Sequence, residues 1–134
     1  MMIPTLICLF LAEVGGQYLI YPELRFQQLI EKSIAPVYPS EDQRAGTVGV
    51  VVLEVRFDRR LAVEATSVLE SPSGSLASAA QQAVTAWRLA PAPPELSSAR
   101  GIVTKLTFYF SRCKGRYVAF YSREAPTPVC GDGR

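Results

Sequence analysis

The chain has 134 residues, of which 49% are hydrophobic and 19% are charged. This length suits one domain, and this composition indicates a buried core and excludes a disordered chain. The net charge of +2 is too small to indicate nucleic acid or an anionic membrane surface as the partner. The sequence has no histidine, the commonest general base and neutral metal ligand. A small enzyme that uses carboxylates, lysine or Cys113 is the alternative, but these residues form no recognisable constellation, so we expect no catalytic residue, no metal site and no cofactor.

An apolar segment lies at the N-terminus. Ile3 to Ala12 read IPTLICLFLA, which is shorter than the roughly 20 residues that span a membrane. The segment fits the apolar part of a secretory signal, with the small residues Val14 and Gly16 before the cleavage site. Because no basic residue precedes the apolar run, a mis-assigned start codon and a buried first strand are the alternatives.

The three cysteines lie near the two ends of the chain. Cys8 would leave with a cleaved signal, whereas Cys113 and Cys130 would remain as an even pair. In an exported protein an even pair predicts a disulfide, and two unpaired thiols are the alternative. On the chain-entropy model such a bridge would stabilise the fold by about 3 kcal/mol.

The first elements after this segment are short. Residues 22–34 predict a helix, because Pro22 suits its first turn and apolar residues recur on one face. A stiff extended stretch follows at residues 36–39, since proline ends the helix. Residues 40–44 predict one helical turn that is closed by Gly46.

A hairpin of two strands comes next. Val48 to Phe57 alternates apolar and polar residues, which predicts a strand with one buried face. Asp58 to Arg60 predicts the turn. The alternation of Val63 to Glu70 is weaker but still predicts the returning strand.

The strongest helical periodicity lies at Leu76 to Leu89, with Ser75 as the expected N-cap and Trp87 as a core residue. Ile102 to Phe110 predicts a further strand, and Arg116 to Tyr121 a fourth. This order predicts an α+β fold, in which helices pack on one face of a small antiparallel sheet of three to four strands.

These elements also predict how the chain divides. We expect an N-terminal signal or apolar segment at residues 1–16, one folded domain at residues 17–121 and a loose tail at residues 122–134.

Several pieces of the sequence resemble the C-terminal domain of the TonB family, in matching order and spacing from Pro36 to Phe110. They are Val37-Tyr38-Pro39 before the first strand, Gly46 and Gly49 with the strand to Phe57, Asp58 in the hairpin, Val68 to Ser71 with Gly74, Ala80 and Ala83 with Trp87 to Ala92, and Thr107 to Phe110.

The resemblance implies a periplasmic protein-binding module that is not an enzyme. In TonB proteins this domain binds an extended segment of an outer-membrane transporter, the TonB box, by strand addition at a sheet edge. In this chain the resemblance implies that the partner adds to the edge of the strand Ile102 to Phe110. The predicted partner-binding residues are Tyr38, Pro39, Lys105, Thr107 and Tyr109. The alternative for Tyr38 is a packed turn without partner contact, and the alternative for Lys105, Thr107 and Tyr109 is a solvated sheet face.

The sequence also departs from the family. It lacks the spanning helix and the long proline-rich spacer of a full TonB protein, and Arg60 replaces the usual hairpin glycine. If Arg116 to Tyr121 pairs with Ile102 to Phe110, it covers the edge that a partner would use. The hypotheses are a binding module without an anchor, a fragment of a TonB energy transducer, and a self-associating domain that forms a homodimer.

Overall fold

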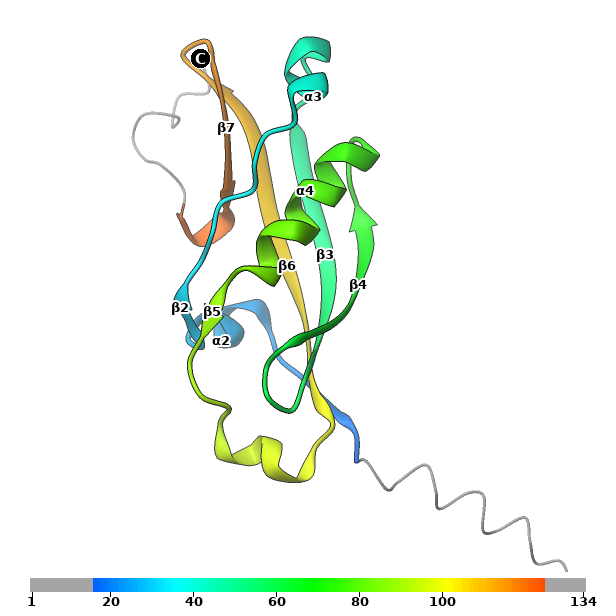
Figure 1. Ribbon diagram of the computed structural model, residues 1–134, viewed down its shortest axis with the longest axis vertical. Helices are drawn as coiled ribbons and strands as arrows, with labels where there is room; N and C mark the ends of the chain where they lie inside the picture. Colours follow the sequence, from blue (N-terminus) through cyan, green and yellow to red (C-terminus); the bar gives the residue numbers. More distant parts are fainter. Residues whose placement is uncertain (1–15, 125–134) are drawn as a thin grey trace, which may run out of the picture.

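The computed structural model describes residues 16–124, which form a curled five-stranded sheet and a small two-stranded sheet (Figure 1). The strand order of the larger sheet is β1-β6-β3-β4, and β7 also pairs with β6. The elements in chain order are β1 (Tyr18–Ile20), α2 (Glu23–Gln27), β2 (Ile30–Lys32), α3 (Ser40–Ala45), β3 (Gly49–Asp58), β4 (Val63–Glu70), α4 (Gly74–Thr85), β5 (Arg88–Leu89), the 3-10 turn η1 (Pro94–Ser98), β6 (Gly101–Cys113), β7 (Arg116–Tyr121) and the 3-10 turn η2 (Ser122–Glu124).

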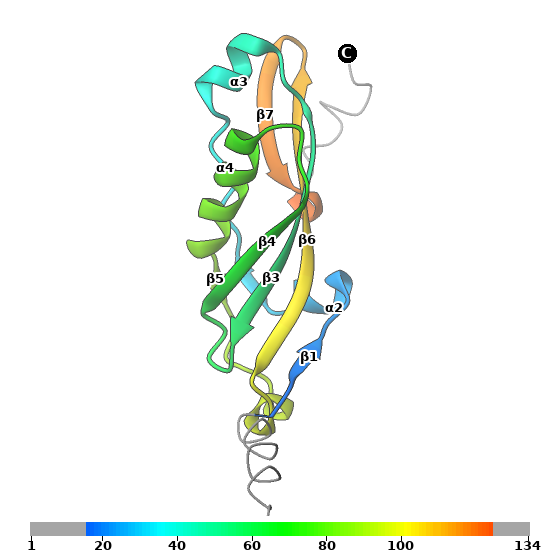
Figure 2. The same cartoon turned by 90° about the vertical axis from the view of Figure 1, so that its right-hand side faces the viewer.

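The predicted α+β class is confirmed, but the sheet has more strands than we expected. β1 adds a strand that runs parallel to β6, so the sheet is mixed and not purely antiparallel. Figure 2 shows α4 along one face of the sheet, and β1 with α2 beside β6. Cys8 and Cys130 lie outside the described residues, as do most of the predicted signal and tail.

The core forms between β3, β6 and α4. Alternate β3 residues, from Val51 to Phe57, are at most 1% exposed, as the alternating pattern predicted. Leu76 and Ala80 of α4 are fully buried with them. Burial of each large apolar side chain contributes about 1.5–3 kcal/mol, so this layer is a main source of the stability of the fold.

The predicted helix over residues 22–34 is wrong in its second half. The helix α2 ends at Gln27, because Ile30 pairs with Leu89 in the two-stranded sheet. Phe26 is nevertheless buried, and its ring stacks on Phe57 with centroids 4.8 Å apart. Phe26 and Ile30 are both buried and lie four residues apart, which is the spacing of one helical face. The sequence pattern therefore predicted a helix although the chain changes from helix to strand between them.

The principal helix is also shorter than its periodicity predicted. α4 ends at Thr85, and its N-cap is Ser73, whose hydroxyl accepts a hydrogen bond from the Leu76 amide at 3.1 Å. Ser75, the expected cap, instead donates a hydrogen bond to the buried carboxylate of Asp42. This bond and a second one from Ser73 to Asp42 join α3 to the start of α4.

The β3–β4 hairpin needs no glycine. The Asp58 carboxylate accepts hydrogen bonds from the amides of Arg60 and Ala62, at 2.8 and 3.0 Å. The left-handed conformation falls on Leu61, with φ 67°, which costs roughly 1–2 kcal/mol for a residue with a side chain. The Leu61 side chain is buried, which offsets this cost.

Candidate partner-binding surfaces

The strand that the resemblance assigned to partner binding, β6, lies inside the sheet. One edge of β6 pairs with β3 from Gly101 to Phe110. The other edge pairs with β1 over residues 101–103 and with β7 over residues 108–113. The sequence left open whether residues 116–121 pair with this strand, and the structure shows that they do, which covers the edge over residues 108–113.

The Glu23 side chain fills part of the gap between β1 and β7, where a pocket of about 340 Å³ also opens beside Lys105. The Glu23 carboxylate accepts a hydrogen bond from the Thr107 main-chain amide at 3.0 Å and another from its hydroxyl at 3.2 Å. The Tyr121 hydroxyl also donates to Glu23, at 2.6 Å, and accepts a hydrogen bond from Gln27. Burial, followed by the hydrogen bond to Glu23, raises the pKa of Tyr121 above its ordinary value. The carboxylate therefore occupies the donor that a neighbouring strand would otherwise use.

The segment that covers this edge is firmly held. Tyr21 and Phe26 are 4% and 0% exposed, and the Tyr21 amide donates to the Val103 carbonyl at 2.9 Å. Removing a buried aromatic side chain typically costs about 3–5 kcal/mol. A partner strand at this edge would have to replace these contacts as well as those of β7.

The predicted contact residue Tyr38 is part of the core. Its ring packs edge-on against Phe110 and Tyr117, with centroids 5.3 and 5.1 Å apart, and its hydroxyl donates to the Thr47 carbonyl. Burial raises the pKa of the Tyr38 hydroxyl. Its neighbour Pro39 is half-buried, and it lines a surface groove.

The other predicted residues share the opposite face of the sheet. Lys105 is exposed, Thr107 is bonded to Glu23, and the Tyr109 ring stacks on Phe120 with centroids 5.5 Å apart. Side chains alternate along a strand, so Tyr109 points to the face opposite that of Phe110, on which the Tyr38 ring packs. The structure therefore groups Lys105, Thr107 and Tyr109 but does not bring Tyr38 to them.

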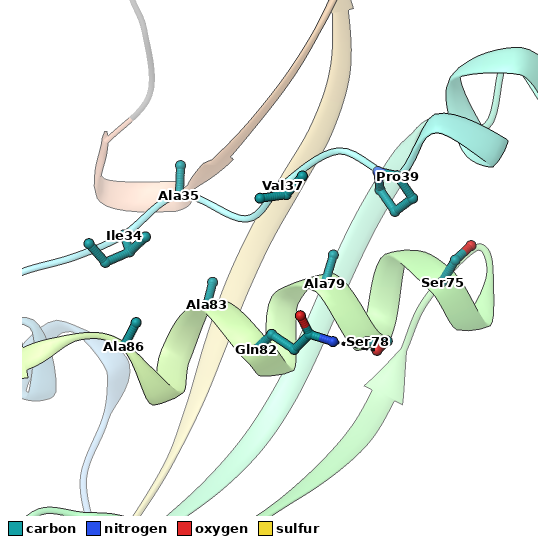
Figure 3. A pocket seen from close by; sticks show the side chains of 10 residues that line it. All are labelled: Ile34, Ala35, Val37, Pro39, Ser75, Ser78, Ala79, Gln82, Ala83 and Ala86. Atoms are coloured by element: carbon teal, nitrogen blue, oxygen red, sulfur yellow. Dashed lines mark hydrogen bonds between the residues drawn. The ribbon is translucent and has the colours of Figure 1, made fainter.

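A groove of about 460 Å³ separates the extended residues 34–39 from α4 (Figure 3). Trp87 fixes one end of this extended segment, because its indole donates to the Ile34 carbonyl at 3.0 Å. Gln43 fixes the other end through the Tyr38 carbonyl. None of the lining residues is charged, and they are Ile34, Ala35, Val37, Pro39, Ser75, Ser78, Ala79, Gln82, Ala83 and Ala86.

The outer edge of β4 is different, because no other strand of residues 16–124 pairs with it. Val68 and Leu69, near the end of β4, are 45% and 50% exposed. Sequence reasoning missed this edge because it carried over the family's contact to β6. The signal was present in the weak alternation of Val63 to Glu70, which is typical of a strand with little covering.

Two kinds of site are absent from the described part of the chain. Residues 16–124 contain no cluster of three or more side chains that could hold a metal ion. They also contain no helix long and apolar enough to cross a membrane.

Comparison with known proteins gives one match. The family model described as Gram-negative bacterial TonB protein C-terminal matches residues 34–111, which is more than half of the chain. No curated protein and no solved structure matches the chain. The matched range begins at the extended segment beside the groove and ends within β6, so β1, α2 and β7 lie outside it.

Proposed function

This chain belongs to the family of Gram-negative bacterial TonB protein C-terminal domains, and we propose that it is a periplasmic protein-binding module without catalytic activity. Its partner is an extended segment of an outer-membrane transporter or of another envelope protein. Binding occurs by strand addition, in which main-chain hydrogen bonds give affinity and side-chain pockets give specificity.

The observation that carries this proposal is a sheet of the TonB type with a long strand at its boundary. β4 has eight residues and no neighbour on its outer side within the described chain. An unpaired strand edge is a template for another polypeptide.

The residues predicted from the resemblance take different parts in this proposal. Pro39 borders the groove beside α4, and Lys105 and Tyr109 are exposed enough to touch a partner that crosses the sheet face. Tyr38 and Thr107 would act by holding the surrounding structure, because both are already bonded within the domain.

Self-association is the second candidate function, and the same open edge favours it. Two copies could pair through β4 in an antiparallel arrangement around a twofold axis. Light scattering over a range of protein concentrations distinguishes the two. We expect a monomer in the absence of partner, and a stable dimer at low concentration would favour self-association.

The direct test is a titration of the purified domain with a synthetic peptide that carries a TonB box, followed by fluorescence anisotropy. A scrambled peptide of the same composition serves as the control. We expect saturable binding of the TonB-box peptide alone. Equal binding of both peptides, or of neither, would contradict the proposed function.

A further inference from the structure

We infer that the partner strand adds to the outer edge of β4, centred on Thr66 and Val68, and not to the edge of β6. This inference rests on the proposed function and identifies its surface. It concerns an extended segment that brings an apolar side chain, and a basic one, to the end of β4.

The hydrogen-bond pattern of the sheet fixes which main-chain groups face outward. The Thr107 amide bonds to Glu23, so it and every second residue of β6 point away from β3. The even-numbered residues of β3 must then face β4, and the bond from the Asp58 amide to the Ala62 carbonyl agrees with this.

The register between β3 and β4 carries this pattern to the boundary of the sheet. Glu54 lies opposite Ser67, and Arg56 lies opposite Ala65, so Ser67 and Ala65 face inward. Main-chain groups alternate along a strand, and those of Thr66 therefore point out of the sheet. The same holds for Val68, which gives two outward donors and two outward acceptors on the open edge.

The flank of α4 beside this edge has room for a partner side chain. A notch at the end of β4 is lined by Val68 and Leu69 on one side and by Gly74, Ala77 and Gln81 on the other. Gly74 and Ala77 are small, the Gln81 amide donates a hydrogen bond to the Thr66 hydroxyl at 2.8 Å, and the two strand residues are about half exposed. The notch thus admits an apolar side chain.

The charge of the notch restricts its partner further. Glu70 is the charged residue among those that line it, and its side chain is exposed. A lysine or arginine in the partner would lie favourably near Glu70, and an acidic residue there would be repelled. The expected segment is therefore short, extended, apolar and not acidic.

The ends of β4 limit how far such pairing extends. The β3–β4 register shifts between Val52 and Leu53 and again between Arg56 and Phe57. Such irregularities bend a strand and protect a sheet from unlimited edge pairing. They leave a regular stretch from Ala65 to Val68, which suits a short segment and disfavours a long β-ribbon.

The other open edges are poorer candidates. β1 has three residues. β7 has six residues against the eight of β4, and its Tyr117 and Tyr121 rings pack on Tyr38 and Trp87 at the face of the sheet. Its outer edge is unpaired within residues 16–124, so the two proline variants compare it directly with β4.

The test uses two matched proline variants of the full chain. Proline is tolerated at an edge strand where the lost amide faces outward. Thr66→Pro removes an outward donor from β4 and also the hydroxyl that accepts a hydrogen bond from Gln81 at 2.8 Å, so Thr66→Val, which loses the hydroxyl alone, is its control.

Ala119→Pro removes an outward donor from β7. Val118 and Phe120 lie opposite Ser111 and Tyr109 of β6, whose main-chain groups point toward β7, so the amide of Ala119 between them points out of the sheet. Circular dichroism and thermal unfolding establish that both variants are folded.

Affinity for the TonB-box peptide is then measured for both variants, and amide hydrogen exchange is measured on the wild-type complex. We expect Thr66→Pro to weaken binding at least about tenfold, Ala119→Pro to change it less than about threefold, and the Thr66 and Val68 amides to be protected. If Thr66→Pro fails to fold, protection of the Thr66 and Val68 amides in the wild-type complex decides whether the peptide adds to β4.

The outcomes separate this inference from the proposed function. Peptide binding that protects β7 or β6 amides, or that is insensitive to Thr66→Pro, overturns the assignment to β4 and leaves the binding function standing. Protection of Thr66 and Val68 by self-association without peptide overturns the partner assigned to the edge. Absence of any specific peptide binding contradicts both proposals.

Discussion

The main-chain amide of Thr107 donates a hydrogen bond to the carboxylate of Glu23, with 3.0 Å between nitrogen and Oε2. A residue from α2 therefore occupies a strand donor in the middle of β6, where neither β1 nor β7 reaches. This contact and the two flanking strands cover most of the edge that family resemblance assigned to the partner, and the outward main-chain groups of Lys105 lie between them.

Replacing Glu23 with alanine tests how much this closure contributes to stability. The change leaves the Thr107 amide and the Tyr121 hydroxyl without their shared acceptor, so we expect the free energy of unfolding to fall by about 1–3 kcal/mol. Urea denaturation monitored by circular dichroism measures it.

Glu31→Ala provides the matched control for that experiment. Glu31 makes an exposed ion pair with Arg88, 3.7 Å from oxygen to nitrogen, which contributes little. We expect a change within about 0.5 kcal/mol. Equal losses in the two variants would show that Glu23 does not hold the edge closed.

The Tyr121 hydroxyl predicts how stability depends on pH. Its pKa is raised in the folded protein, chiefly by burial and then by the bond to Glu23, so the folded state favours the neutral hydroxyl. This contribution to stability is complete below the unfolded pKa of about 10 and is lost as the pH rises from there toward the folded pKa.

Urea unfolding at pH of about 9 and about 11 measures this effect. We expect the wild type to lose stability between the two, and the Tyr121→Phe variant to lose less, because phenylalanine does not titrate. A variant that loses as much as the wild type would show that other groups cause the alkaline dependence.

Comparison of the sequence with the structure explains where prediction worked. The strand from Val48 to Phe57 was predicted correctly because one of its faces is buried along its whole length, which makes the alternation complete. The turn that Gly46 closes was also correct, since its φ of 73° favours glycine. The strand at residues 116–121 was predicted from its local pattern, but its pairing with β6 was left open.

Prediction failed where tertiary contacts override local pattern. Ile30 joins a two-stranded sheet through pairing with Leu89, a partner far away in the sequence. β1 is three residues long, too short to give a periodic signal. The hydrogen bond from Thr107 to Glu23 joins residues that no sequence pattern relates. The sequence alone therefore left open whether residues 116–121 cover the edge of β6, and it could not show that Glu23 binds Thr107 beside them.

The two substitutions Tyr38→Phe and Tyr38→Ala distinguish a structural role of this residue from a contact role. Loss of the hydroxyl that bonds to Thr47 should cost about 1 kcal/mol, whereas loss of the ring between Phe110 and Tyr117 should cost about 3–5 kcal/mol. Chemical denaturation of both variants checks this order.

Peptide affinity completes the comparison at Tyr38. The phenylalanine variant keeps the packed ring, so we expect its affinity for the TonB-box peptide to stay within about twofold of the wild type. A tenfold loss with phenylalanine would instead assign the hydroxyl a direct contact with the partner.

The pairing of Cys113 with Cys130 remains a prediction, because Cys130 lies outside the described residues. Cys113 is buried at the end of β6. We expect protease digestion of the protein without reductant to give a linked product that contains both cysteines and separates into two peptides on reduction. Alkylation of Cys113 in the unreduced, unfolded protein would contradict the predicted bridge.

The central claim is that β4 recruits an extended polypeptide through its main chain. Nuclear Overhauser effects between an unlabelled TonB-box peptide and the ¹⁵N-labelled domain test it most directly. We expect cross-strand contacts from peptide α-protons to the amides of Thr66 and Val68. Contacts to β7 or β6, with those two amides unchanged, would contradict it.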